Sequence, residues 1–286
     1  MVSASVDALA QAAFASSESI FAIDSPSSHP SRTIEHLGDK YTISNQSPTV
    51  TILQANADPF HKVQESAAAN KDLTAVLATS DVLLPAIPHL FKIASQRSAV
   101  AVHVETKERE SESHHTNISN GATKTGFVPS HADLMAVRQT GFAILTSDNA
   151  QTAFDLALVA QAAAVQTSTP FLNAANASAS KSDKVVLDHQ KVAPALISEQ
   201  DLAAHKERQA AVSEISLSSL YLNPTPAADA AADTPSTAAA AAATPEEIYN
   251  KVEELLVTLQ KHTGRAYRPI EYQGNESLFF FVSICD

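Results

Sequence analysis

The residues of this sequence whose types could bind a metal ion lie in and beside one polar stretch. His103, His114 and His115 fall within or just before the charged segment from Glu105 to Pro129, which also supplies glutamates. Imidazole nitrogen and carboxylate oxygen are common zinc ligands. The segment has neither an H-E-x-x-H motif nor another paired-ligand spacing, and it shows no apolar periodicity. The pattern therefore favours an exposed loop over a metal site.

Motifs for other catalytic chemistry are missing from the 286 residues. There is no G-x-G-x-x-G or Walker A sequence to hold a dinucleotide or a nucleoside triphosphate, and no G-x-S-x-G motif with a nucleophilic serine. The single cysteine, Cys285, cannot form an intramolecular disulfide and cannot supply the four ligands that a cubane iron–sulfur cluster normally needs. We therefore expect no cofactor in this chain.

The elements that would position any site alternate between strand and helix patterns. A helical spacing of apolar residues begins with Val6, and four buried strands are expected in the first 105 residues. Alternation of this kind predicts βαβ units, so we expect an α/β fold with a mostly parallel sheet and flanking helices. The expected strands are 20–23, 49–53, 73–79 and 99–104, with a helix over 82–94 that Pro85 and Pro88 must start or break.

The second half of the chain continues the same alternation. A helix opens at Ser130 or His131, and the longest helix is expected from Ala150 to Thr167. Further strands are expected over 142–146 and from Pro170, followed by a charged helix over 198–211. We predict that the segments 73–79, 99–104 and 142–145 are central strands of the sheet.

Composition suggests where the domains end. Residues 1–215 are expected to form one domain with a poorly ordered insertion at 106–128, and residues 216–244 an alanine- and proline-rich linker. Thr244-Pro245-Glu246-Glu247 predicts a helix start, with Thr244 as N-cap and a helix that ends at Gly264. The apolar run from Leu278 to Ile284 then predicts the first strand of a following, incomplete domain, so residues 245–286 are expected to belong to that unit.

Charge and hydropathy limit the partners. The net charge of −12 argues against nucleic acid, which needs clustered Lys and Arg. No segment approaches the ~18 apolar residues of a membrane span, and the N-terminus lacks the basic region of a signal peptide. We expect a cytoplasmic protein without a membrane partner.

A family resemblance rests on the segment from His131 to Ala143, HADLMAVRQTGFA. It resembles the pyrimidine-binding domain of 2-oxoacid:ferredoxin oxidoreductases, where the same place is approximately H-x-D-V-M-A-x-R-Q-T-G-F-A. The segment GRAYRPIEYQG, from Gly264 to Gly274, is similar to a second motif of that family. The resemblance implies a thiamine-diphosphate-binding fold.

Three positions carry the functional part of this resemblance. The family's proton-relaying glutamate, on a V-E-M-Q-type strand, corresponds to Ile52, which cannot transfer a proton. A substrate-facing threonine corresponds to Ser25, which keeps a hydroxyl, and a substrate arginine to Lys107, which keeps the charge but not the bidentate fork. The glycine-rich segment after the glutamate and the GDG element for Mg²⁺ are absent, so the resemblance implies a domain that is inactive on its own.

A domain altered in this way resembles the N-terminal region of fungal-type assimilatory NADPH sulfite reductases. The similar segments are 19–22, 138–142, 169–173 and 264–274. The resemblance implies a non-catalytic scaffolding or docking segment of a flavoprotein or haemoprotein subunit. Flavin, NADPH, sirohaem and an iron–sulfur cluster would then be held by other modules, which would be its partners. The alternatives are a fragment of a pyruvate:ferredoxin oxidoreductase and a free-standing α/β binding module.

Overall fold

A computed structural model describes nine stretches of the chain. They are residues 4–26, 28–37, 48–106, 108–111, 126–129, 131–176, 185–186, 189–214 and 243–268. None of the helices in these stretches is long and apolar enough to cross a membrane.

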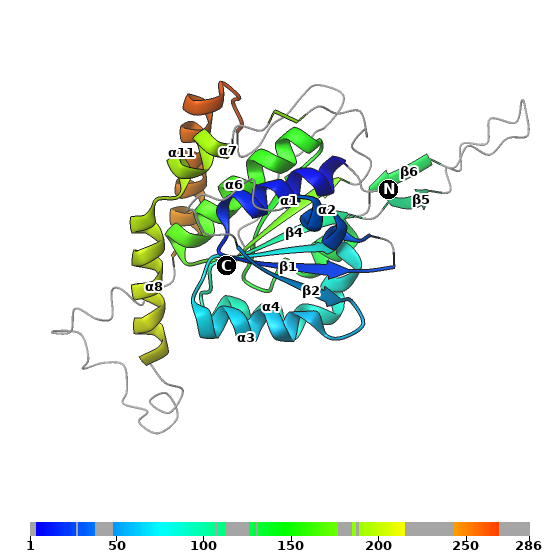
Figure 1. Cartoon of the computed structure of the whole chain (residues 1–286), viewed down its shortest axis with the longest axis horizontal. Helices are drawn as coiled ribbons and strands as arrows, with labels where there is room; N and C mark the ends of the chain where they lie inside the picture. Colours follow the sequence, from blue (N-terminus) through cyan, green and yellow to red (C-terminus); the bar gives the residue numbers. More distant parts are fainter. Residues whose placement is uncertain are drawn as a thin grey trace, which may run out of the picture.

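The centre of the molecule is a six-stranded sheet in which every neighbouring pair is parallel (Figure 1). The strand order is β2-β1-β3-β4-β8-β7. The predicted α/β fold with a parallel sheet is thereby confirmed. The strands are β1 (Ser19–Asp24), β2 (Thr49–Gln54), β3 (Thr74–Thr79), β4 (Val100–Thr106), β7 (Ala143–Ser147) and β8 (Phe171–Asn176).

Helices cover both faces of this sheet (Figure 1). One face carries α1 (Ala4–Ser16), α2 (Pro30–Leu37), α6 (Ala150–Thr167), α7 (His189–Leu196) and α11 (Pro245–Thr263). The other carries α3 (Pro59–Asn70), α4 (Leu83–Ser95) and the short α5 (Ala132–Ala136). Helix α8 (Glu199–Glu214) lies beside the sheet and is held largely by polar contacts.

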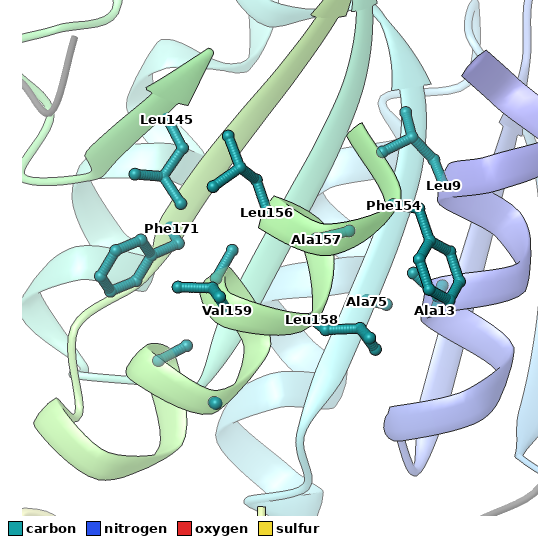
Figure 2. Close-up of a cluster of buried hydrophobic side chains, with 14 of the residues drawn as sticks. Leu9, Ala13, Ala75, Leu145, Phe154, Leu156, Ala157, Leu158, Val159 and Phe171 are labelled. Atoms are coloured by element: carbon teal, nitrogen blue, oxygen red, sulfur yellow. The ribbon is translucent and has the colours of Figure 1, made fainter. Parts of the chain in front are cut away.

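The two apolar cores follow from strand periodicity. Successive residues of β3 face opposite layers, so Ala75 and Leu77 join the α1–α6 core while Val76 joins the α3–α4 core. Helix α6 is buried around almost its whole circumference, as expected of a helix that is apolar on all sides. Figure 2 shows Phe154, Leu156 and Leu158 of α6 among side chains from α1 and the sheet. Many of the packed residues are alanines, which lets these helices approach closely.

Two expectations about individual elements need correction. The segment 142–145 was expected in the centre of the sheet, but β7 is an edge strand. It is nevertheless apolar because both its faces are buried. The helix over 83–95 continues through Pro88, whose side chain is exposed. Helices α2, α3 and α7 have no counterpart among the expected elements.

The expected insertion at 106–128 is only partly described. Its ends form an antiparallel ribbon of β5 (Glu108–Ser111) and β6 (Gly126–Pro129), where the sequence indicated only a loop. Residues 112–125 lie outside the described stretches. So do most of the expected linker at 216–244 and the expected strand at 278–284, so those expectations stay predictions.

The start of α11 is confirmed in detail. The Thr244 hydroxyl accepts a hydrogen bond from the Glu247 backbone N–H, and the Glu247 carboxylate accepts one from the Thr244 N–H at 2.7 Å, which is a complete capping box. The hydrogen bonds that the Thr244 backbone N–H and hydroxyl donate to the Glu247 carboxylate lower the pKa of Glu247. The helix ends before Gly264, whose φ of 75° is left-handed.

Candidate functional site

Polar side chains gather where β1 and β3 end, at the carboxyl edge of the sheet. Parallel α/β sheets bind ligands at this edge. Asp24 and Ser25 end β1, Thr79 and Ser80 end β3, and Asp133 reaches the same place from α5. We call these five residues, together with Asp81, the carboxyl-edge cluster. Only Ser25 was identified from the sequence. The others could have been found from their positions directly after apolar strand segments or within the HADLMA segment.

Ser25 lies inside the cluster and does not face solvent. Its side chain is 2% exposed. Its Oγ accepts a hydrogen bond from the Ser28 backbone N–H at 3.2 Å and lies 3.2 Å from Thr79 Oγ1. Thr79 Oγ1 also bonds the carboxylate of Asp81. The hydroxyl of Ser25 is therefore part of an internal network.

Asp24 places a negative charge at the start of α2. Its carboxylate accepts hydrogen bonds from the Ser31 backbone N–H at 3.1 Å and from the Ser31 hydroxyl at 2.6 Å. His29 Nδ1 lies 3.8 Å away. A helix N-terminus at this edge is a natural anion site, and here the chain's own carboxylate occupies it.

The cluster as a whole is acidic. Asp133 accepts a hydrogen bond from the Ser80 hydroxyl at 3.2 Å, and Asp24 and Asp81 are the other two acidic residues of the cluster. A cluster of like charges disfavours the approach of another anion, such as a 2-oxo acid. Lys107, the position expected to offer a positive charge, lies outside the described residues.

Ile52 lies on the edge strand β2 with its side chain 45% exposed. It pairs with Ala22 of β1, and no residue of β2 carries a carboxylate. Both oxygens of Asp24, the acidic residue that ends the neighbouring strand, already accept bonds from Ser31. The described residues therefore do not fit a site that activates thiamine diphosphate by proton transfer.

His103, considered above as a metal ligand, lies in the core instead. It is fully buried in β4, and its Nε2 lies 2.9 Å from Gln161 Nε2 of α6. Burial lowers the pKa of His103 to about 3, so the ring is neutral. His114 and His115 lie outside the described stretches. Within those stretches no group of three or more histidine, cysteine, aspartate or glutamate side chains is placed to hold a metal ion.

The segment from Arg138 to Phe142 directly precedes the edge strand β7, and Thr140 and Phe142 within it are buried. Thr140 Oγ1 donates to the Val137 carbonyl at 2.7 Å, and Phe142 is 1% exposed. Gly141 has a φ of 89°, and a Cβ there would lie 3.0 Å from Ala94 Cβ of α4. These residues line one wall of a surface cavity of about 700 Å³. Within the motif that carries the family resemblance, Thr140, Gly141 and Phe142 are therefore explained by close packing.

Comparison with known proteins connects these observations to one family. A family model described as pyruvate flavodoxin/ferredoxin oxidoreductase, thiamine diphosphate-binding, matches residues 67–260. A putative pyruvate-flavodoxin oxidoreductase of Synechocystis is 30% identical over 210 residues, covering 71% of this chain and 16% of the relative. The probable pyruvate-flavodoxin oxidoreductase of Escherichia coli is 28% identical over 266 residues, covering 86% of this chain and 20% of the relative.

This chain therefore spans about a fifth or less of the length of these two relatives. Among solved structures, a 2-oxoglutarate:ferredoxin oxidoreductase from Magnetococcus marinus matches with a TM-score of 0.43 and 12% identity. That match covers 62% of this chain and 29% of the other. A likeness this low carries no argument about function.

The expectation of a sulfite reductase segment is wrong. The matching family and the curated relatives are oxidoreductases named for pyruvate, and nothing in them points to sulfite or to sulfur assimilation. The alternative named beside it, a portion of a pyruvate:ferredoxin oxidoreductase, fits these relatives better. The two hypotheses share the same domain, so the shared motifs could not separate them.

Proposed function

The chain belongs to the pyruvate flavodoxin/ferredoxin oxidoreductase thiamine-diphosphate-binding family, and we propose that it is a structural domain of a 2-oxoacid oxidoreductase-type protein. In this role the domain packs against other domains and does not activate the cofactor. The observation that carries the proposal is Ile52 on β2, the position of the proton-relaying glutamate in the resemblance, where the strand has no carboxylate at all.

The carboxyl-edge cluster supports the same proposal. A 2-oxo acid needs positive charge and free hydrogen-bond donors, whereas this cluster presents three carboxylates and hydroxyls already bonded within the chain. General acid–base groups typically contribute ~10²–10⁴-fold to a rate, so we expect the missing carboxylate to lower any turnover by about that factor.

The first experiment tests cofactor use by the wild-type protein. Isothermal titration calorimetry measures binding of thiamine diphosphate with Mg²⁺, and a low-potential dye reports oxidative decarboxylation of pyruvate. We expect neither micromolar binding nor turnover. Micromolar binding together with decarboxylation would overturn the proposal, whereas binding without turnover would leave the domain non-catalytic but able to hold the cofactor.

A gain-of-function pair tests the role of position 52. Ile52→Glu restores a carboxylate at the proposed relay position, and Val50→Glu places one two residues earlier on the same face of β2. Val50 and Ile52 are 38% and 45% exposed, so both variants should fold. We propose that the missing glycine-rich segment and the acidic carboxyl-edge cluster also prevent turnover. In that case Ile52→Glu gains no turnover. Turnover in Ile52→Glu but not in Val50→Glu would show that the edge is otherwise competent.

A further inference from the structure

Asp155 of α6 has the most deeply buried carboxylate among the described residues. Its side chain has no exposure, yet it is not isolated. Arg265 donates to it from Nε at 2.7 Å and from Nη2 at 2.9 Å, and the Tyr267 hydroxyl donates at 2.6 Å. Gln151 of the same helix adds a weaker contact at 3.3 Å. We call Asp155, Arg265 and Tyr267 the Asp155 anchor.

The strong partners of Asp155 all come from far along the chain. Arg265 and Tyr267 follow it by 110 and 112 residues. A buried carboxylate is costly unless paired, and a bidentate arginine is the strongest side-chain partner available. Burial and the nearby carboxylate raise the pKa of Tyr267, so its hydroxyl stays a donor. The site on α6 is therefore complete only when the segment after α11 is in place.

Helix α11 adds an apolar interface directly before this anchor. Five of its side chains are at most 4% exposed and belong to the same core as α6 and α7, beside which the helix lies in Figure 1. Gly264 then turns the chain so that residue 265 faces α6. The five side chains are those of Ile248, Val252, Leu255, Leu256 and Leu259.

We propose that residues 243–268 form a docking module that binds the α6–α7 face in its own right, with the Asp155 anchor as its specific contact. The apolar side chains supply most of the contact area, and the anchor selects the register because only one placement of α11 brings Arg265 to Asp155. The module then fixes the position of residue 268 on the domain, independently of the segment that connects α8 to α11. This goes beyond the structural role proposed above and does not depend on it.

Cutting the connecting segment in the full-length protein tests the proposal. A specific protease site is inserted after Asp233, and cleavage is followed to completion on a denaturing gel. Size-exclusion chromatography of the cut protein at about 1 µM, a concentration that retains complexes of sub-micromolar Kd, then shows whether the fragments stay together. We expect co-elution. Separation of the fragments in the otherwise unaltered cut protein would overturn the proposal.

Two substitutions distinguish the anchor from apolar packing alone. Tyr267→Phe keeps the ring and removes one bond to a charged group, so the Kd between fragments should rise roughly 10-fold or more. Arg265→Gln leaves Asp155 without its cation, and a rise on the order of 10²–10³-fold is expected. Lys251→Gln removes an exposed ion pair with Glu254 on the same helix and is the matched control.

The folded state of each variant is checked by circular dichroism before cleavage. Because Tyr267→Phe is the mildest change, it keeps the test decisive even if Arg265→Gln does not fold. A Kd for Tyr267→Phe equal to that of Lys251→Gln would show that apolar packing, not the anchor, holds the module.

Discussion

The carboxylates of the carboxyl-edge cluster and the carboxylate of the Asp155 anchor differ in their hydrogen-bond partners. In the carboxyl-edge cluster, Asp24 and Asp133 accept bonds from serine hydroxyls or a backbone N–H. In the Asp155 anchor, a single fully buried carboxylate receives three bonds from an arginine and a tyrosine. The anchor is built as a closed structural contact. The cluster stands at the edge where parallel sheets bind ligands, but its groups are bonded to each other or to neighbouring residues of the chain.

The residues that match the family motifs also fall into two groups: those that pack or bond within the fold, and the position of the proton relay. Gly141 and Phe142, within the segment that matches best, are explained by packing against α4 and the sheet. Arg265, within the second motif, completes the anchor. By contrast, the position that carries proton transfer in the resemblance holds Ile52. The motif residues that pack or bond within the fold and the isoleucine at the position of the proton relay are both consistent with the structural role that we propose.

The largest effect should come from Asp155. Asp155→Ala removes the fully buried acceptor of three bonds from the partly buried Arg265 and Tyr267, and loss of one partner of a buried pair costs roughly 3–5 kcal/mol of unfolding free energy. Asp133→Ala, at the carboxyl edge, removes one hydroxyl contact of a half-buried side chain and should cost about 1 kcal/mol. Urea unfolding of both variants measures the difference. Equal losses of unfolding free energy would contradict the contrast between the Asp155 anchor and the carboxyl-edge cluster.

A pH dependence of the unfolding free energy should come from two buried histidines, His103 and His205. Burial lowers the pKa of His103 to about 3, and burial together with the Arg208 guanidinium lowers that of His205 to about 4. The unfolded chain takes up protons near pH 6.5 while the folded chain does not, so stability is full above that pH and falls below it. At pH 5 each histidine should cost about 2 kcal/mol relative to pH 7.

Urea unfolding at pH 7 and pH 5 measures this loss. His205→Leu should reduce the difference between the two pH values by about 2 kcal/mol, because it removes one of the two proton-binding groups. His262→Gln, at an exposed histidine of α11, is the control and should leave the difference unchanged. A pH difference that is the same in wild type and His205→Leu would show that His205 is not responsible.

Two glycines in the described stretches, Gly141 and Gly264, have a left-handed backbone and allow a smaller, matched comparison. At Gly141 an added Cβ meets Ala94 Cβ at 3.0 Å, whereas at Gly264 it meets nothing within 4 Å. Gly264→Ala should therefore cost only the backbone strain, about 1 kcal/mol, and Gly141→Ala should cost roughly 2–3 kcal/mol because contact is added to strain. Thermal unfolding of the pair isolates the contact with α4.

Local patterns explain why much of the fold could be predicted. Helix α6 was expected with the bounds that the structure has, because its long apolar stretch is a local signal. The edge position of β7 was not, because strand order depends on which βα units pack together and not on the strand's own residues. Helices α2, α3 and α7 were missed because they are short or weakly amphipathic.

The carboxyl-edge cluster and the Asp155 anchor also differ in how far the sequence alone could predict them. Ser25 and Ile52 could be located by motif, but only the structure shows that Ser25 is buried and that Asp24 bonds Ser31. The pairing of Asp155 with Arg265 joins residues 110 positions apart, and a single sequence has no local signal for such a contact. Chemistry predicted from motifs therefore needs the structure to show whether its groups are free.

The smallest effect on stability is expected at Ile52 itself. Its side chain is 45% exposed on an edge strand, so Ile52→Glu should change the unfolding free energy by no more than about 0.5 kcal/mol. Leu53 is one residue further along β2, faces the α3–α4 core and is 7% exposed. Leu53→Glu buries a charge without a partner and should cost more than roughly 3 kcal/mol. Urea unfolding of both variants tests whether position 52 is free of structural constraint. A large loss in Ile52→Glu would mean that isoleucine is needed there for packing, and the change from glutamate would then reflect the fold and not the loss of chemistry.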